Sequence, residues 1–478
     1  MDGQEFSEIL LSKTDKIKFR LDSDYYSITN LEIEQMIKNR SGKTIRQINA
    51  TMDCSAFYPS IIEYYDTNGA GIPFLRVNEI SNGMVQVSEN TAFLPQEVLD
   101  NNKNTIAIVY PGDIIIAKGG NTLAKVGLIT NEYQTYAISR DVIALRTSSL
   151  TDVSNYYLWS YLHSSYGQCM LWRSASQTGQ PHLTLPSIYD IKIPLFSDEF
   201  QEQIKYLYLM SVRNKRMAND AYCSAEQLLL SELGMVDFTS FLTPVAVKSL
   251  SVSFLSSGRL DAEYYQPKYD ALFDALSTHP SKHLGGKNGI VSIKKSIEPG
   301  SDAYSIEGVP FVRISDLTTF GITDPEVKLS KEIVPNLSTL FPCKDTILFS
   351  KDGSVGIAYK AEKDFEVVTS GAILHLRVKK PKEILPDYLT LVLNSAIVQL
   401  QAERDSSGAI IKHWKPSEIE KVIIPILDIS FQKIIVDKVQ TSFSLRHQSD
   451  HLIEKAKRAV EIAIEQGECK ALEWLQQY

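Results

Sequence analysis

The sequence FRLDSDYY at residues 19–26 returns as GRLDAEYY at residues 258–265. A second motif, IPFLRVNEI at residues 72–80, returns as VPFVRISDL at residues 309–317. Both pairs keep their order along the chain. Their period exceeds 230 residues, whereas solenoid repeats run roughly 20 to 50 residues. The motifs therefore indicate two copies of a domain-sized unit, which suits a target that has two parts.

A third motif pair stands before two long helical patterns. IKIP at residues 191–194 is followed by Phe200-Gln201, and VIIP at residues 422–425 by Phe431-Gln432. Small and apolar residues then recur at alternating steps of three and four, the spacing of a coiled-coil seam. The two seams match in the repeat, so we expect an antiparallel coiled coil rather than two helices that each pack on their own globule. The expected seam residues are Leu207, Ala218, Ala221, Ala225 and Leu228 in the first helix and Leu445, Leu452, Ala456 and Ala459 in the second.

Short apolar runs mixed with helical periodicity predict an α/β fold of the mixed α+β kind in each half. Residues 106–109 and 114–117 are typical of buried strands, and helical periodicity covers residues 155–170 and 385–403. We expect two tandem globules in a pseudo-two-fold arrangement, each followed by a long helix. The expected boundaries are 1–198 for the first globule, 199–235 for its helix, 236–257 for a linker, 258–430 for the second globule and 431–478 for its helix.

Composition places the chain among ordinary globular proteins. It has 478 residues, 44% of them hydrophobic and 22% charged, with a net charge of −8, so widespread disorder is not expected. None of the five cysteines forms a CxxC pair, which argues against a zinc site or a disulfide framework. The sequence shows no signal peptide and no apolar stretch of spanning length. We expect a cytoplasmic protein without membrane contact, whose DNA contacts, if any, are confined to local basic surfaces.

Motifs for catalysis are absent from the sequence. Ser41-Gly42-Lys43-Thr44 resembles the end of a phosphate-binding loop, but Ile37 stands where that motif requires its first glycine. No Asn/Asp-Pro-Pro-Tyr/Phe tetrad of an amino-methyltransferase is present, and the histidines form no HxxxH metal pair. We therefore expect no catalytic residues, no metal site and no cofactor in this chain, and two duplicated halves that serve recognition.

Two segments in each half carry the polar side chains that contact DNA. Residues 118–127 and their counterpart 351–356 combine lysines with glycines that permit close backbone approach. Residues 173–182 and 404–414 are rich in side chains that read base edges. Ordinary hairpins and polar loops remain the alternative for all four segments. The candidate DNA-binding residues are Lys118, Asn121, Lys125, Arg140, Arg173, Gln177, Gln180, His182, Lys351, Ser354, Lys360, Arg404, Lys412 and His413.

The ordered motifs resemble the specificity (S) subunit of Type I restriction-modification systems. The similarity runs through IPFLR at residues 72–76, PGDIIIAK at 111–118, YAIS at 136–139 and FQEQI at 200–204, with counterparts in the second half. The resemblance implies two target-recognition domains that read a split double-stranded DNA sequence, with the two helices as the ruler between them. The second half departs from the first, with TSGA at residues 369–372 against ISRD at 138–141, so we expect an asymmetric target.

The resemblance also implies partners. Such subunits dock two modification subunits, which use S-adenosylmethionine to methylate adenine, and restriction subunits that use ATP and Mg²⁺ join the complex. Three other interpretations remain open at this point: a stand-alone pseudo-dimeric DNA-binding regulator, an enzyme with an unrecognised site, and a scaffold that binds only proteins. Tight sequence-specific binding by the isolated chain would favour the regulator, and catalysis by the isolated chain would favour the enzyme.

Overall fold

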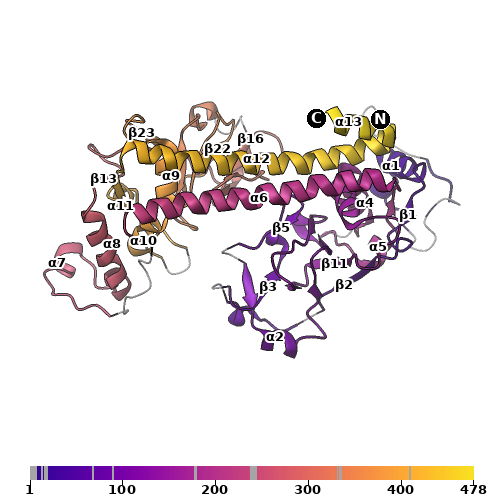
Figure 1. Cartoon of the computed structure of the whole chain (residues 1–478), viewed down its shortest axis with the longest axis horizontal. Coiled ribbons are helices and arrows are strands. Elements are labelled where there is room, and N and C mark those ends of the chain that lie inside the picture. The colour runs from indigo at the N-terminus through magenta and orange to yellow at the C-terminus, as the bar shows by residue number, and fades with distance from the viewer. Residues whose placement is uncertain are drawn as a thin grey trace. The chain divides into compact units, whose positions relative to one another are not determined.

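The computed structural model describes residues 8–11, 14, 20–56, 58–66, 69–88, 91–176, 180–236, 245–330, 332, 336–408 and 411–477. Backbone contacts divide the chain into two units. Unit 1 comprises Met1–Lys215 and His447–Tyr478, and unit 2 comprises Arg216–Arg446. Figure 1 colours both along the chain. Unit 1 therefore combines the first part of the chain with its C-terminal segment, whereas unit 2 is one continuous segment.

Unit 1 contains two main sheets. One has the strand order β2-β11-β8-β9-β5-β4 and the other β6-β3-β10-β7, in which β3 and β10 are parallel. A short pair, β1 and β12, closes the end of the globule. The strands are β1 (Lys43–Thr44), β2 (Thr51–Cys54), β3 (Ile72–Leu75), β4 (Ile80–Ser81), β5 (Met84–Val85), β6 (Ala92–Leu94), β7 (Ile108–Val109), β8 (Ile114–Ala117), β9 (Val126–Leu128), β10 (Tyr136–Ile138), β11 (Val142–Arg146) and β12 (Lys192–Ile193).

Unit 2 repeats this strand order. The sheet β14-β23-β20-β21 corresponds to β2-β11-β8-β9, the parallel pair β16 and β22 to β3 and β10, and the short pair β13 and β24 to β1 and β12. The strands are β13 (Ser281–His283), β14 (Val291–Lys295), β15 (Tyr304–Ser305), β16 (Val309–Val312), β17 (Leu317–Thr318), β18 (Gly321–Ile322), β19 (Lys328–Leu329), β20 (Ile347–Ser350), β21 (Ala358–Lys360), β22 (Val368–Thr369), β23 (Ile373–Val378) and β24 (Ile423–Pro425). The mixed α+β prediction is thus confirmed.

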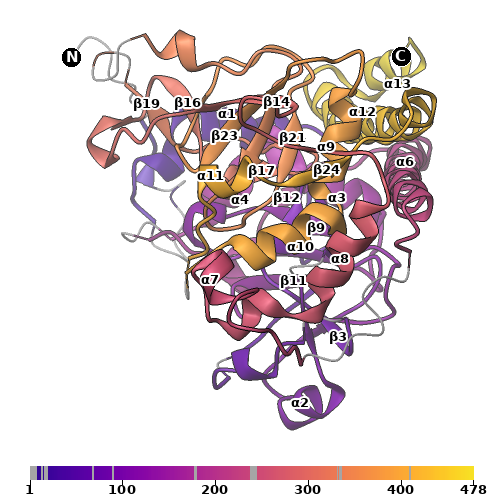
Figure 2. The same cartoon turned by 90° about the vertical axis from the view of Figure 1, so that its left-hand side faces the viewer.

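Several shorter helices pack on these sheets. In unit 2, α9 lies next to β21, as Figure 2 shows. Unit 1 contains α1 (Ile28–Lys38), α2 (Gln96–Asn101), α3 (Asn155–His163), α4 (Ser165–Ser174) and α5 (Leu185–Tyr189), and unit 2 contains α7 (Phe254–Ser257), α8 (Pro267–Ser277), α9 (Pro386–Asn394), α10 (Ala396–Asp405) and α11 (Pro416–Ile419).

The single helices expected at residues 155–170 and 385–403 are each broken in two. Ser164 and Ser395 leave the helical conformation, with ψ of 164° and 165°. The Ser164 hydroxyl then accepts a hydrogen bond from the Gly167 amide and caps α4. A side chain at Gly167 would meet the Tyr161 carbonyl oxygen at 2.0 Å, so the corner requires glycine. Periodicity continued through the break because both helices bury one face against the same core.

The Phe-Gln motif has a structural reason in both halves. The Gln201 side chain is buried, accepts a hydrogen bond from the Ser154 amide at 2.6 Å and donates to the Asp152 and Phe196 carbonyls. Gln432 makes the equivalent set with the Leu385 amide and the Glu383 and Leu427 carbonyls. Each glutamine thus ties the start of a long helix to the loop before the helix pair.

The two long helices are α6 (Asp198–Glu232) and α12 (Ile429–Gln466), and a short α13 (Glu468–Gln477) follows. Gly234 and Gly467 follow the ends of α6 and α12 with φ of +67° and +102°, the left-handed conformation that glycine adopts readily after a helix. Unit 1 contains the start of α6 and the end of α12, and unit 2 contains the remaining parts. Figure 1 shows α6 in magenta and α12 in yellow.

Seam positions on both helices are buried within their units. Ala218, Ala225, Ala456 and Ala459 are fully buried and Leu207 is nearly so, whereas Ala221, Leu228, Leu445 and Leu452 are half-buried. Leu229, one position after Leu228, takes the buried place in the core of unit 2. In unit 1, Ser211 and Ser449 are fully buried and joined through their hydroxyls at 2.8 Å.

We expect the seam serines to have opposite effects on stability. Each hydroxyl of Ser211 and Ser449 also lies within hydrogen-bond distance of the other's backbone carbonyl, at 2.9 and 3.0 Å, and its single proton is donated either to that carbonyl or to the partner hydroxyl. Ser442, which corresponds to Ser211 in the repeat, is fully buried, and its Oγ has no hydrogen-bond partner among the described residues. Ser449→Ala should lower the free energy of unfolding by about 1–3 kcal/mol, whereas Ser442→Ala should leave it unchanged or raise it by about 1 kcal/mol.

Urea titrations of the two single variants measure this difference. Ser211→Ala/Ser449→Ala provides the control, because removing both partners at once leaves no orphaned hydroxyl and should cost less than the sum of the single changes. Equal losses for Ser449→Ala and Ser442→Ala would show that the serine pair adds nothing to the packing of the helices.

Two buried histidines predict acid sensitivity. Burial lowers the pKa of His163 to about 3, with Lys457 acting in the same direction. Burial lowers the pKa of His375 to about 4, and its Nε2 lies 2.8 Å from the Thr369 hydroxyl. A histidine with a lowered folded-state pKa binds its proton more readily in the unfolded chain, so stability falls as the pH drops below the unfolded value of about 6.5. Each histidine should cost on the order of 2 kcal/mol by pH 5.

Denaturation of His163→Gln and His375→Gln at pH 7 and pH 5 checks this expectation. Each variant should lose less stability between the two pH values than the unmodified chain loses. His451→Gln is the matched control, because His451 is exposed. Parallel pH dependences in all four proteins would contradict the assignment of the acid sensitivity to the buried pair.

In the described part of the chain, no helix is both long enough and apolar enough to cross a bilayer. The five cysteines are free thiols. Among the described residues, no group of three or more His, Cys, Asp or Glu side chains is arranged to hold a metal ion.

Candidate nucleic-acid interface

Three candidate segments of unit 1 meet at the end of β8. The Lys118 amide donates to the Asp141 carbonyl at 2.8 Å, and the Leu183 amide donates to the Lys118 carbonyl at 2.8 Å. Gly119 forms a bridge with His182. A Cβ on Gly119 would lie 2.2 Å from the His182 ring, so a side chain at this position would require the ring to move. Lys118 thus joins segments that are far apart in the sequence.

The side chains on this frame are mostly solvent-accessible. Asn121, Lys125, Arg140, Gln180 and His182 are exposed, and Lys118 is half-buried. Lys118, Lys125 and Arg140 form no ion pair with another described residue, so their positive charge faces solvent uncompensated. Gln177 lies outside the described residues. We define the unit 1 recognition surface as Lys118, Asn121, Lys125, Arg140, Gln180 and His182.

Unit 2 contains the same backbone frame at the end of β20. The Lys351 amide donates to the Ala372 carbonyl at 2.9 Å, and the Trp414 amide donates to the Lys351 carbonyl at 2.8 Å. These two bonds correspond in the repeat to the two bonds of Lys118. The Gly353 amide also donates to the Lys412 carbonyl at 2.8 Å. The frame therefore recurs although the loop that it holds is shorter.

The side chains on the second frame differ from those on the first. Asp352, at the position of Gly119, forms an ion pair with Lys351 and lies 2.9 Å from His413 Nδ1. Ser354, Lys412 and His413 are exposed. We define the unit 2 recognition surface as Lys351, Asp352, Ser354, Lys412 and His413. Its net positive charge is smaller than that of unit 1, because Asp352 compensates Lys351.

Three of the candidate basic residues have partners inside the protein. Lys360 on β21 forms an ion pair with Asp387 at 2.8 Å, and its side chain is 15% exposed. Arg173 forms an ion pair with Glu34 at 2.9 Å and is 7% exposed. Arg404 forms an ion pair with Asp405 at 2.7 Å. The structure leaves these three off the exposed recognition surfaces, and their contact with DNA stays a prediction without structural support.

Arg173 and Arg404 belong to an arrangement that sequence reasoning missed. In unit 1, the guanidinium carbons of Arg20 and Arg173 lie 4.6 and 4.2 Å from the centroid of the Tyr25 ring. Arg20 also forms an ion pair with Asp22 at 2.7 Å, and this bond lowers the pKa of Asp22. The first repeated motif therefore builds a stack of one tyrosine and two arginines. The sequence signal for this stack was that Arg20 and Arg173 both recur in the second half, as Arg259 and Arg404.

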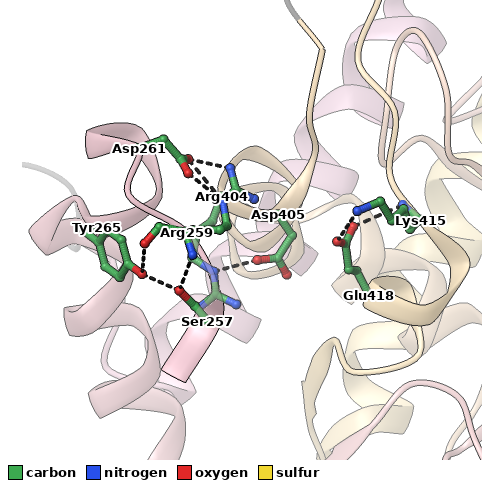
Figure 3. Close-up of polar contacts among 8 residues, drawn as sticks. All are labelled: Ser257, Arg259, Asp261, Tyr265, Arg404, Asp405, Lys415 and Glu418. Carbon is green, nitrogen blue, oxygen red and sulfur yellow. Dashed lines mark hydrogen bonds and ion pairs between the residues drawn. The ribbon is translucent and has the colours of Figure 1, made fainter. Parts of the chain in front are cut away.

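Unit 2 builds the equivalent stack. Arg259 and Arg404 lie 4.5 and 4.9 Å from the Tyr264 ring. Figure 3 shows the ion pairs that hold the two arginines, Arg259 with Asp261 and Arg404 with Asp405. The Tyr265 hydroxyl donates to the Arg259 carbonyl at 3.0 Å. Through Arg404, the stack anchors the repeated motif at residues 258–265 to α10. In unit 1, Arg173 anchors the motif at residues 19–26 to α4 in the same way.

Residues 288–455 match the model of a protein family described as the Type I restriction modification DNA specificity domain. This segment is similar to a Type I DNA specificity domain. The match confirms the resemblance found in the sequence, that of a specificity subunit of a Type I restriction-modification system. It also supports the role of a DNA sequence-recognition subunit that is not itself an enzyme, and it does not favour the stand-alone regulator. A comparison with curated protein sequences gave no match.

Solved structures of specificity subunits are similar to this chain. The Type I S subunit from M. genitalium has 15% sequence identity over 90% of this chain and 95% of its own, with a TM-score of 0.34. The HsdS subunit from Thermoanaerobacter tengcongensis has 16% identity over 86% of this chain and 96% of its own, with a TM-score of 0.27. The similarity to a specificity domain rests on the family match over residues 288–455.

Proposed function

We propose that this specificity protein reads a bipartite, asymmetric double-stranded DNA target, one half-site with each recognition surface. The observation that carries the proposal is the backbone frame around Lys118 and Lys351, which recurs in both units and holds different side chains. Two domains that bind DNA in the same orientation but read different bases are expected to share their backbone hydrogen bonds and to differ in the side chains that face the DNA. Uncompensated lysines supply phosphate contacts within a chain of net charge −8.

The long helices would act as the ruler between the half-sites. The serine pair of unit 1 and the buried alanines on both helices support close packing of α6 on α12 as an antiparallel coiled coil. Alanine and serine at a seam let helix axes approach closely. In this arrangement the two target-recognition units follow a pseudo-two-fold relation that comes from the duplicated sequence. The spacer of the target then depends on helix length.

Chemistry would reside in other subunits of the complex. The described residues of this chain contain no metal-ligand cluster, and the matched family is a DNA specificity domain. We propose that two modification subunits dock on this chain and supply adenine methylation with S-adenosylmethionine. Restriction subunits that use ATP and Mg²⁺ would join them in the cytoplasm, where the DNA target lies.

Mapping of methylated adenine across the host genome, with and without this gene, tests the proposal. Deletion should remove methylation at one split motif whose two halves differ, and the intact gene supplied in trans should restore it. A complementing gene whose unit 1 surface carries Lys118→Ala and Asn121→Ala provides the control for direct recognition. A methylome that stays unchanged on deletion while the modification subunits are expressed and active would overturn the proposal.

A further inference from the structure

A large apolar side chain is exposed at the same place in both units. Leu21 is 76% exposed and Leu260 is 72% exposed, and they occupy equivalent positions in the first repeated motif. Ten residues earlier, Leu11 is 77% exposed and Leu250 is 60% exposed. Single exposed leucines are common on protein surfaces. Exposure at equivalent positions with the same spacing in two copies is what sets these four apart.

The residues on either side of Leu21 are held by side-chain contacts. Arg20 is bound to Asp22 and stacks on Tyr25, and it donates to the Ala175 carbonyl at 2.9 Å. Because residues 20 and 22 are joined to each other, the residue between them extends away from their ion pair. Leu21 also lines a cavity of about 590 Å³ that extends to Arg173 and His182. An apolar group presented on a rigid backbone loses little conformational entropy on binding.

The residues on either side of Leu260 make the equivalent contacts. Arg259 donates to Asp261 at 2.9 Å and stacks on Tyr264. Figure 3 shows this support, in which Tyr265 also contacts Ser257 and the Arg259 carbonyl. The ion pair leaves no net charge beneath either leucine. Asp24 in unit 1 and Glu263 in unit 2 then add an acidic side chain at the same position in each motif.

The contrast with the recognition surfaces indicates what the leucines contact. Surfaces that read two different half-sites differ between the units, as Gly119 and Asp352 do. A surface that binds the same partner twice has to stay the same in both copies, as Leu21 and Leu260 do. Acidic neighbours disfavour DNA phosphates, so a protein with an apolar pocket and a basic rim fits better than a DNA groove.

We propose that Leu21 and Leu260, supported by the Arg–Tyr–Arg stacks, form two equivalent docking surfaces for two copies of the modification subunit. The inference rests on the proposed function, because it requires two such subunits on one specificity protein. Each leucine enters an apolar pocket of one copy, and the acidic neighbour faces the basic rim of that pocket. Each copy of the modification subunit would thus bind its unit through the equivalent leucine.

Native mass spectrometry of the full chain with its modification subunit tests the proposal. Leu21→Ser and Leu260→Ser should each weaken the binding of one copy by about tenfold, as expected for an apolar anchor, and the double variant should weaken both. The controls are Ile62→Ser and Ile306→Ser, because these side chains are 69% and 93% exposed. Their equivalent positions in the repeat hold Pro299 and Gly69, so neither is duplicated. The controls should retain both copies at unchanged affinity.

Three results would overturn the docking surfaces. The double leucine variant could hold two copies as tightly as the unmodified chain does, or the isoleucine controls could lose as much affinity as the leucine variants. The third is a loss of DNA affinity by the leucine variants without any modification subunit present, which would assign the leucines to DNA. If the unmodified chain binds no modification subunit at all, the proposed function fails along with this inference, and that outcome is read from the unmodified chain alone.

Discussion

Replacing Lys118, Asn121 and Lys125 by alanine should relax base selection in one half of the target and leave the bases of the other half unchanged. All three side chains belong to the unit 1 recognition surface, on loops that one backbone frame holds. Asn121 can contact a base edge, a contact whose loss costs about 1–3 kcal/mol, and the two lysines contact phosphates that fix the unit on the DNA, so the triple variant should bind its target about a hundredfold more weakly. Sequencing of the sites methylated by the assembled complex should show relaxed bases in a single half-site.

The salt dependence of binding separates the two units. Each lysine that contacts a phosphate contributes about one to the slope of log K against log salt concentration. Lys118→Ala/Lys125→Ala should therefore lower the slope by about two. Lys351→Ala/Lys412→Ala should lower it by less, because Asp352 compensates Lys351 within the protein. Titrations of the assembled complex with its target at several salt concentrations measure both slopes.

Two matched variants control the base-selection experiment with the unit 1 triple variant. Lys351→Ala/Ser354→Ala/Lys412→Ala should relax the opposite half-site, since these residues form part of the unit 2 recognition surface. Lys205→Ala removes a lysine on α6 that pairs with Glu202, and it should change neither half-site. If the unit 1 triple variant weakened both half-sites equally, its lysines would serve general affinity and the assignment of bases to unit 1 would be wrong.

Lengthening both long helices by one heptad should change the spacer of the target and preserve its half-site bases. The insertions follow Lys215 in α6 and Arg446 in α12, the positions at which each helix passes from one unit to the other. Seven residues add about 10 Å of helix, and one base pair rises about 3.4 Å. The spacer should therefore lengthen by about three base pairs. The heptad keeps the seam on nearly the same helix face, with a drift of about 20°.

Methylome sequencing with the lengthened protein reads the spacer and both half-sites together. The control carries the same heptad in α6 alone, so the seam contacts of unit 1, such as Ser211 with Ser449, and the seam positions of unit 2 can no longer keep one continuous register between the two helices. That variant should lose stability and methylate poorly at every spacer. A doubly lengthened protein that kept the original spacer, or one that selected new half-site bases, would refute the helical ruler.

Much of the architecture could be predicted because its causes are local. The repeat follows from the motifs themselves, and α6 and α12 follow from periodicity that ends at glycines with positive φ. The helix pairs were predicted only as helices. Ser164 and Ser395 break them through corners whose tightness depends on Gly167 and the Tyr161 carbonyl, a contact that periodicity does not report.

The residue types of the candidate site could be predicted from the sequence, but only the tertiary structure shows which of these residues are exposed. Lys118, Asn121 and His182 had equal standing with Arg173 in the sequence, since all are polar residues in repeated loops. Folding buries Arg173 between Tyr25 and Glu34, whereas it leaves Asn121 and His182 exposed and Lys118 half-buried. Burial depends on which segments meet, and residues 173 and 25 meet only through long-range packing of α4 on the first motif.

The sequence by itself determined the duplication, the two long helices and the family to which the motifs point, because motif identity and helical period are written in consecutive residues. Tertiary structure alone decided which polar loops form one surface. The Leu183 amide donates to the Lys118 carbonyl, 65 positions earlier in the chain, and the Lys118 amide donates to the Asp141 carbonyl. No local propensity encodes such bonds. It also decided that Asp352 compensates Lys351 while Lys118 stays uncompensated, because charge compensation requires distances that only the folded chain sets.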